Sequence, residues 1–138
     1  METLGPPSQK TKPSQTIKRA AVSRRVLVVE DDIDSARSLT WILRDMGHDV
    51  EYAINGYVAV DIAQQMRPQF VLLDLALPGM NGFEVCKRLR RMAALEGVRI
   101  IAISAYAQDE YRQRSKEAGC DAYIVKPLDP AVLELLLD

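Results

Sequence analysis

The sequence contains few of the residues on which several kinds of chemistry depend. Its 138 residues include only two cysteines and one histidine. Cys86 and Cys120 have neither the spacing of metal ligands nor that of a CxxC motif, so we expect two free thiols in a reducing cytosol. A Ser-His or Cys-His catalytic pair would have to use His48, which lies in a turn-like Gly-His-Asp segment. We interpret His48 as a surface loop residue.

Long apolar runs are also missing. No segment approaches the roughly 20 apolar residues that a membrane-spanning helix needs. The first 23 residues lack the apolar stretch of a secretory signal, so we expect a cytoplasmic protein that has no membrane partner. Apolar residues make up 48% of the sequence and charged residues 27%, which is typical of one globular domain with its own core.

Charge is distributed unevenly along the chain, although the net charge is only −1. Residues 1–25 carry six basic side chains and one acidic side chain, whereas the rest of the chain carries 12 basic and 18 acidic ones. A basic tail can bind nucleic acid or an acidic partner. Because proline, serine, threonine and glutamine are frequent in it, we interpret residues 1–23 as a disordered basic leader and residues 24–138 as the folded domain.

From Arg25 onward, short apolar runs alternate with segments of helical periodicity. The apolar runs predict five strands, near 26–29, 50–53, 70–73, 100–103 and 122–125. Five helices are predicted: from a cap near Asp34 to Met46, then 58–66, 83–92 and 108–118, and one that Pro130 opens. This alternation favours an α/β fold, a doubly wound five-stranded parallel sheet in the flavodoxin-like order 2-1-3-4-5.

Four of the five predicted strands end in polar or charged residues. These are Glu30 and Asp31 after the first strand, Asp74 after the third, Ser104 after the fourth and Lys126 after the fifth. Polar residues are expected where strands leave a core. Acids on two ends and a lysine on a third, all at one edge of a parallel sheet, also form a set that can converge into a ligand site.

The chemistry of such a set favours phosphoryl transfer. Crowded carboxylates repel one another unless a cation intervenes, and Mg²⁺ suits a site of oxygen ligands that also holds phosphate oxygens. Lys126 adds a compact positive charge and Ser104 a hydroxyl donor, while one carboxylate is left as a nucleophile. The set includes no second carboxylate or histidine placed as a general base, so an acyl phosphate formed here would persist.

Four segments resemble the receiver domain of bacterial two-component response regulators. They are Val28 to Asp32, Leu72 to Gly82, Ile103 to Ala105 and Val125 to Pro127, and the resemblance covers about Arg25 to Leu137. It implies that Asp74 accepts the phosphoryl group. It also implies that Asp31, Asp74 and the backbone carbonyl of Ala76 ligate Mg²⁺, for which Mn²⁺ can substitute, with Glu30 acting through a water molecule.

The resemblance assigns further roles around the phosphoryl group. Lys126 would contact the phosphoryl group, and the Lys126–Pro127 bond would be cis. The hydroxyl of Ser104 would turn toward the phosphoryl group, and Tyr123 is in the position of the aromatic switch residue. Tyr106 and Ala76 occupy positions that affect how long the phosphoryl group lasts: small Ala76 leaves room for water, and Tyr106 could cover it or be only a surface aromatic.

Other functions fit the residues less well. A phosphatase of the haloacid dehalogenase type needs a second aspartate two residues after the nucleophile, where this chain has Ala76. A nucleotide binder on the same fold needs a phosphate-cradling loop after the first strand, where this chain has three acids. A degenerate receiver, which binds proteins without being phosphorylated, would be expected to lack one of the acidic, hydroxyl or lysine positions.

The expected partners follow from the same resemblance. The phosphoryl donor would be a sensor histidine kinase or a histidine phosphotransfer protein, and output would pass by contact to a downstream target protein. The domain would catalyse only its own phosphorylation and slow dephosphorylation. No DNA-binding segment is recognisable in the sequence, and we expect a monomer or a weak homodimer through the fourth and fifth helices.

Overall fold

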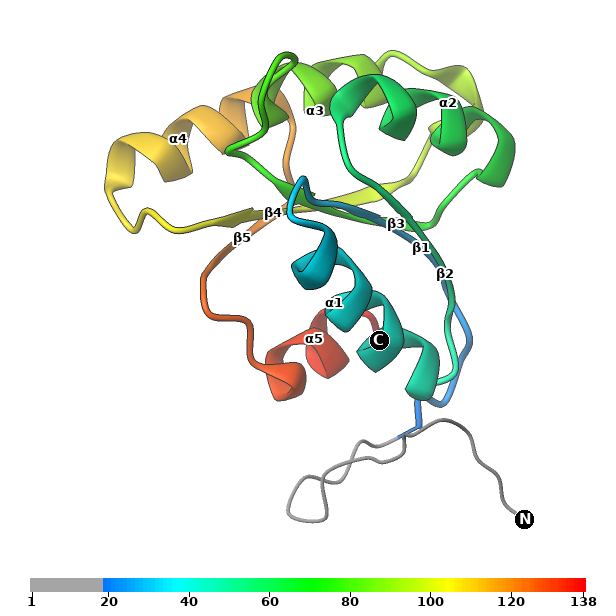
Figure 1. Cartoon of the computed structure of the whole chain (residues 1–138). Coiled ribbons are helices and arrows are strands. Elements are labelled where there is room, and N and C mark those ends of the chain that lie inside the picture. Colours follow the sequence, from blue (N-terminus) through cyan, green and yellow to red (C-terminus); the bar gives the residue numbers. More distant parts are fainter. Residues whose placement is uncertain (1–18) are drawn as a thin grey trace, which may run out of the picture.

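The computed structural model describes residues 19–138, which form a five-stranded parallel sheet (Figure 1). The strand order is β2-β1-β3-β4-β5, as the sequence predicts. The strands are β1 (Arg25–Val29), β2 (Asp49–Ala53), β3 (Phe70–Asp74), β4 (Arg99–Ser104) and β5 (Ala122–Val125). The three central strands carry continuous apolar runs because helices cover both of their faces.

The five helices of the described residues lie in two layers, one on each face of the sheet (Figure 1). They are α1 (Ile33–Asp45), α2 (Gly56–Met66), α3 (Gly82–Arg90), α4 (Asp109–Ala118) and α5 (Pro130–Leu136), and a short 3₁₀ turn, η1 (Ala93–Leu95), follows α3. Leu39 and Leu43 of α1 and Leu133 of α5 pack in one apolar cluster on one face of the sheet. The other face is covered by α2, α3 and α4, which contribute Ala63, Leu89 and other residues to a second cluster.

Several helix boundaries differ from the sequence prediction by one or two residues, and two of the differences are informative. The cap of α1 is Asp32 rather than Asp34, because Asp32 has an extended backbone and its Oδ2 accepts a hydrogen bond from the backbone N–H of Ser35. The third helix ends at Arg90 instead of Met92. The apolar spacing continues beyond Arg90 because η1 still places Leu95 in the core.

His48 is buried, so its interpretation as a surface loop residue is wrong. Only 6% of the residue is exposed, and its Nδ1 atom accepts a hydrogen bond of 3.0 Å from the backbone N–H of Arg24. The Arg24 side chain in turn donates to the backbone carbonyls of Leu137 and Asp138. His48 follows a turn, but Arg24, which precedes β1, binds both His48 and the residues after α5.

The described end of the basic leader also contacts this region. The backbone N–H of Ala20 donates to the carbonyl oxygen of Met46 at the end of α1. Residues 1–18 of the predicted leader lie outside the described residues. Among the helices that the structure does describe, none has the length and apolar character to cross a membrane.

The environment of His48 predicts that acid destabilises the fold through this residue. Burial, together with the nearby charge of Arg24, holds the pKa of His48 below its usual value. Between the folded pKa and the unfolded pKa of about 6.5, the unfolded chain binds more protons, so stability falls as the pH falls through that window. In urea unfolding, the free energy of unfolding of wild type should therefore decrease below about pH 6.5. His48→Asn should lack this decrease, because its side-chain oxygen can still accept the hydrogen bond from Arg24 but does not titrate.

Nuclear magnetic resonance provides the control, because the chain has one histidine. The imidazole should titrate below about 6.5 in the folded protein. A titration at or above that value, or identical pH dependence in wild type and His48→Asn, would contradict this account.

Candidate functional site

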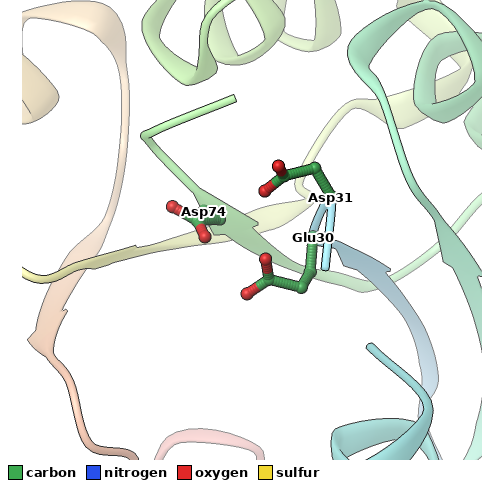
Figure 2. Close-up of side chains that lie close together, drawn as sticks. All are labelled: Glu30, Asp31 and Asp74. Atoms are coloured by element: carbon green, nitrogen blue, oxygen red, sulfur yellow. The ribbon is translucent and has the colours of Figure 1, made fainter. Parts of the chain in front are cut away.

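Three carboxylates meet at the carboxyl ends of β1 and β3 (Figure 2). The two strands are neighbours in the sheet, and their parallel register pairs Val29 with Leu73. Glu30 and Asp74 are therefore the next residues on adjacent strands, and Asp31 follows Glu30 at the turn into α1. One oxygen atom from each of the three side chains lies within 4.8 Å of the others. Glu30 and Asp74 are buried, whereas Asp31 is exposed.

Lys126, which follows β5, reaches across to two of these acids. Its Nζ atom lies 2.9 Å from Oδ2 of Asp74 and 3.2 Å from Oε1 of Glu30. The backbone N–H of Lys126 donates to the carbonyl oxygen of Ser104, and the Lys126–Pro127 peptide bond is cis, as the resemblance implies. The other oxygen of Asp74, Oδ1, accepts a hydrogen bond of 2.9 Å from the backbone N–H of Ala76.

Burial and charge set the protonation of this cluster. Burial raises the pKa of Glu30, and repulsion from Asp74 raises it further, although the backbone N–H of Asp32 and the charge of Lys126 oppose these effects. For Lys126, burial lowers the pKa, but its contacts with Asp74 and Glu30 outweigh burial and leave the pKa above its usual value. Lys126 is therefore a fixed positive charge beside a crowded pair of carboxylates.

The donor set fits a hard divalent cation. Its side-chain ligands are all carboxylate oxygens, the kind that Mg²⁺ prefers, and they converge from two strands. A single ammonium group offsets the negative charge of two buried carboxylates in this structure. A bound cation would add the compensation that the third acid, Asp31, also requires.

Ser104, Tyr106 and Tyr123 form a chain of contacts beside the acids. Ser104 is 3% exposed, and its Oγ atom accepts a hydrogen bond of 3.0 Å from the backbone N–H of Tyr106. The hydroxyl of Tyr123 donates to the carbonyl oxygen of Tyr106 at 2.6 Å. The ring of Tyr106 stacks on Tyr111 of α4, with 4.7 Å between ring centroids. These contacts connect the end of β4 with β5 and α4.

Gly82 is a positioning residue that the sequence predicts only as the end of the receiver-like segment from Leu72, just before the third helix. A Cβ atom on Gly82 would lie 2.7 Å from the carbonyl oxygen of Asp74 and 2.5 Å from Cα of Leu75. The first residue of α3 thus packs against the backbone that presents Asp74, where no side chain fits. Asn81 begins the helix by accepting the N–H of Glu84 at its Oδ1 atom. The Asn-Gly pair was the available signal, and its close approach to Asp74 arises only in the folded chain.

A cavity of about 510 Å³ beside the cluster was also not foreseen from the sequence. Glu30, Asp74 and Lys126 line one part of it, while Leu39 of α1 and Leu128 line an apolar part. The site therefore combines charged groups with an apolar wall that α1 supplies.

Comparison with known proteins gives consistent results. The sequence model described as the response regulator receiver domain matches residues 26–138. The DNA-binding response regulator MtrA of Mycolicibacterium paratuberculosis is 42% identical over 110 residues, which are 80% of this chain and 48% of MtrA. An uncharacterised 14.6 kDa protein of Leptolyngbya boryana is 38% identical over 111 residues, which are 80% of this chain and 83% of that protein. The chain spans about half the length of the MtrA relatives that it matches.

Solved structures show the same fold. The chemotaxis protein CheY4 of Vibrio cholerae is 30% identical with a TM-score of 0.79, covering 84% of this chain and 97% of CheY4. The receiver domain of a sensor histidine kinase from Pseudomonas aeruginosa, solved with a magnesium ion in its active site cleft, is 29% identical with a TM-score of 0.76 and covers 84% and 95% of the two chains. From the match over residues 26–138 and these relatives, we conclude that the chain belongs to the family of response regulator receiver domains.

Proposed function

We propose that this receiver domain accepts a phosphoryl group on Asp74 and uses it as a reversible switch. The observation that carries the proposal is the position of Asp74, a buried carboxylate at the end of β3 with the ammonium group of Lys126 at 2.9 Å. A carboxylate oxygen can act as a nucleophile, and a fixed cation beside it stabilises the charge that a phosphoryl group brings. Membership of the receiver family supports the same role.

The phosphoryl group would come from a phosphohistidine on a sensor histidine kinase or a histidine phosphotransfer protein. An oxygen of Asp74 attacks phosphorus, the phosphorus–nitrogen bond breaks, and an acyl phosphate remains on the aspartate. Asp31, Asp74 and the carbonyl of Ala76 would bind Mg²⁺ or Mn²⁺, with Glu30 acting through water. The bound cation would neutralise phosphoryl oxygens. The magnesium ion in the similar Pseudomonas receiver supports this assignment. Lys126 pairs with a phosphoryl oxygen on the side of β5.

Ser104 is suited to sense the new group. Its Oγ atom accepts the backbone N–H of Tyr106, so its own proton is free to be donated elsewhere. Turning this hydroxyl toward the phosphoryl group would release the N–H of Tyr106, whose carbonyl is held by Tyr123. The contact between Tyr106 and α4 would change in turn. Phosphorylation would thus shift a pre-existing equilibrium toward a conformation that a downstream target protein prefers.

Ala76 and Tyr106 bear on the lifetime of the phosphorylated state. Ala76 is exposed, and its small side chain leaves room for water near Asp74. Tyr106 is 48% exposed and its ring stacks on Tyr111, so it would have to leave that stack to cover the phosphoryl group.

The cytoplasmic location and a weak homodimer through α4 and α5 stay predictions. The exposure of Leu135 on α5, which is 76%, supports the homodimer.

Labelling with a small phosphodonor such as acetyl phosphate tests the acceptor assignment. Wild type with Mg²⁺ should gain the mass of one phosphoryl group, and Asp74→Asn should gain none, because the amide is not a nucleophile. Asp61→Asn is the matched control: this exposed aspartate of α2 should be dispensable. Full labelling of Asp74→Asn would contradict the assignment, and a wild type that no donor labels would favour a degenerate receiver.

Adjacent acids allow a sharp test of the metal ligands. Saturating Mg²⁺ at about 100 times its Kd should stabilise wild type by about 2.7 kcal/mol, which raises the melting temperature by roughly 10 °C. Asp31→Asn should lose most of this rise. Asp32→Asn should keep it, because the asparagine oxygen can still cap α1 at Ser35. Equal responses of the two variants would contradict the assignment of Asp31 to the metal and of Asp32 to the helix cap.

The raised pKa of Glu30, caused mainly by its burial, predicts a pH-dependent loss of folding stability in metal-free buffer. Because the folded pKa lies above the unfolded value of about 4.5, ionised Glu30 destabilises the folded state at neutral pH. This loss of stability fades as the pH falls through the folded pKa and is gone below about 4.5. Glu30→Gln should therefore be more stable than wild type near pH 7, with the difference lost near pH 4. Glu84→Gln, which loses an exposed ion pair with Arg88, should be slightly less stable than wild type at pH 7. A neutral-pH loss of stability in Glu30→Gln would contradict the account.

A further inference from the structure

Two buried cysteines lie next to each other although they are 34 positions apart in the sequence. Cys86 is in α3, and Cys120 lies between α4 and β5. Their Sγ atoms are 3.4 Å apart, with the thiol of Cys120 donating toward Cys86. Cys86 is fully buried and Cys120 is 9% exposed. Both are free thiols, and the proposed phosphorylation chemistry uses neither.

Neighbouring contacts hold the backbones of both cysteines in place. Arg90, one turn after Cys86 in α3, donates from Nε to the carbonyl oxygen of Gly119 at 2.8 Å and also pairs with Asp121. The residues on both sides of Cys120 are therefore tied to α3. The thiol of Cys86 itself donates to the carbonyl oxygen of Ala118 at 3.3 Å. The closeness of the two sulfur atoms thus follows from contacts that involve other groups.

Charge and hydrogen bonding give the two thiols different roles. Hydrogen-bond donation from Cys120, assisted by the nearby charge of Arg90, lowers the pKa of Cys86 even though burial opposes it. Donation toward Cys86, together with burial, raises the pKa of Cys120. Cys86 is the thiol that ionises more easily, and a thiolate is the form that reacts with oxidants.

We propose that Cys86 and Cys120 form a reversible intramolecular disulfide when a hydroperoxide oxidises the folded domain. The Cys86 thiolate attacks one peroxide oxygen, the oxygen–oxygen bond breaks, and the departing oxygen takes a proton, which leaves a sulfenic acid. The sulfur of Cys120 then attacks the sulfur of Cys86, the sulfur–oxygen bond breaks, and water leaves with the thiol proton. Two thiols lose two electrons in total, and hydrogen peroxide becomes two molecules of water.

The geometry demands only a small movement. A disulfide has a sulfur–sulfur distance of about 2.05 Å, so atoms that are 3.4 Å apart must approach by about 1.3 Å. Access for the oxidant would come from local opening of α4, whose residue Ala118 accepts the hydrogen bond of Cys86. Only Ser115 and Ala118 of its ten residues are buried, so local opening of this helix costs little.

The disulfide would connect α3 to the segment that enters β5. It would close a loop that contains β4 and α4, and β5 carries Tyr123 and leads to Lys126. Oxidation would therefore restrict the movement of α4 relative to α3. Such a redox input acts on the conformation of the domain and needs no phosphoryl group on Asp74.

The test treats folded wild-type protein with hydrogen peroxide and analyses it without reduction. Intact mass should fall by two hydrogen atoms, peptide mapping should find Cys86 joined to Cys120, and no disulfide-linked dimer should form. Because the cross-link constrains the unfolded chain, the melting temperature should rise by roughly 5–15 °C and return after reduction with dithiothreitol. Cys86→Ala and Cys120→Ala, which keep apolar side chains in the core, should show neither change.

A comparison of disulfide formation in native wild type and in wild type unfolded in urea tests the proposal without relying on the alanine variants. The disulfide should form in the native protein at least as fast as in the unfolded chain, because the fold holds the sulfur atoms together. The proposal is overturned if wild type instead gives sulfinic or sulfonic acids or intermolecular dimers, if it forms the bond only in urea, or if the oxidised protein melts at a lower temperature.

Discussion

The ion pairs of Lys126 with Asp74 and Glu30 are the interaction on which the site depends. Two carboxylates that are 4% and 8% exposed would be costly to ionise together without a nearby cation. The ammonium group of Lys126 lies within hydrogen-bonding distance of both and offsets part of their charge. The remaining negative charge, increased by Asp31, suits the same place to a divalent cation, which in the proposed function would in turn neutralise phosphoryl oxygens.

The sheet makes this meeting possible, since the three groups belong to three different strands. Parallel pairing of β1 with β3 brings Glu30 beside Asp74, and pairing of β3 with β4 and of β4 with β5 brings Ser104 and Lys126 to the same edge. Contacts outside the strands then fix the details. Gly82 allows α3 to approach the backbone at Asp74, and the N–H of Ala76 orients one carboxylate oxygen.

Much of the fold could be predicted from the sequence because the signals are local. Continuous apolar runs identified the central strands, and strictly alternating elements predicted the parallel order. The strand-end positions of Asp74 and Lys126 were enough to place them at one edge of the sheet. The cap of α1 was misplaced by two residues, since Asp32 and Asp34 are both acceptable caps by composition and only the backbone conformation distinguishes them.

What could not be predicted depends on contacts between distant segments. Nothing near His48 in the sequence indicates that Arg24 will donate to it, or that the same arginine will also bind Leu137 after α5. The pair formed by Cys86 and Cys120 has no sequence motif, because its closeness arises from the packing of α3 against the end of α4. Gly82 was visible as a turn residue, but its contact with the backbone at Asp74 was not.

The central claim is that the acids at the ends of β1 and β3 bind one divalent cation beside the ammonium group of Lys126. Manganese titration followed by nuclear magnetic resonance tests it most directly, because the paramagnetic ion broadens the signals of residues close to it. The account predicts that broadening begins at residues 30–31 and 74–76 and extends to Ser104 and Lys126. Added Mg²⁺ should reverse the broadening. Broadening centred on other acidic residues of the surface, or spread evenly over the chain, would contradict it.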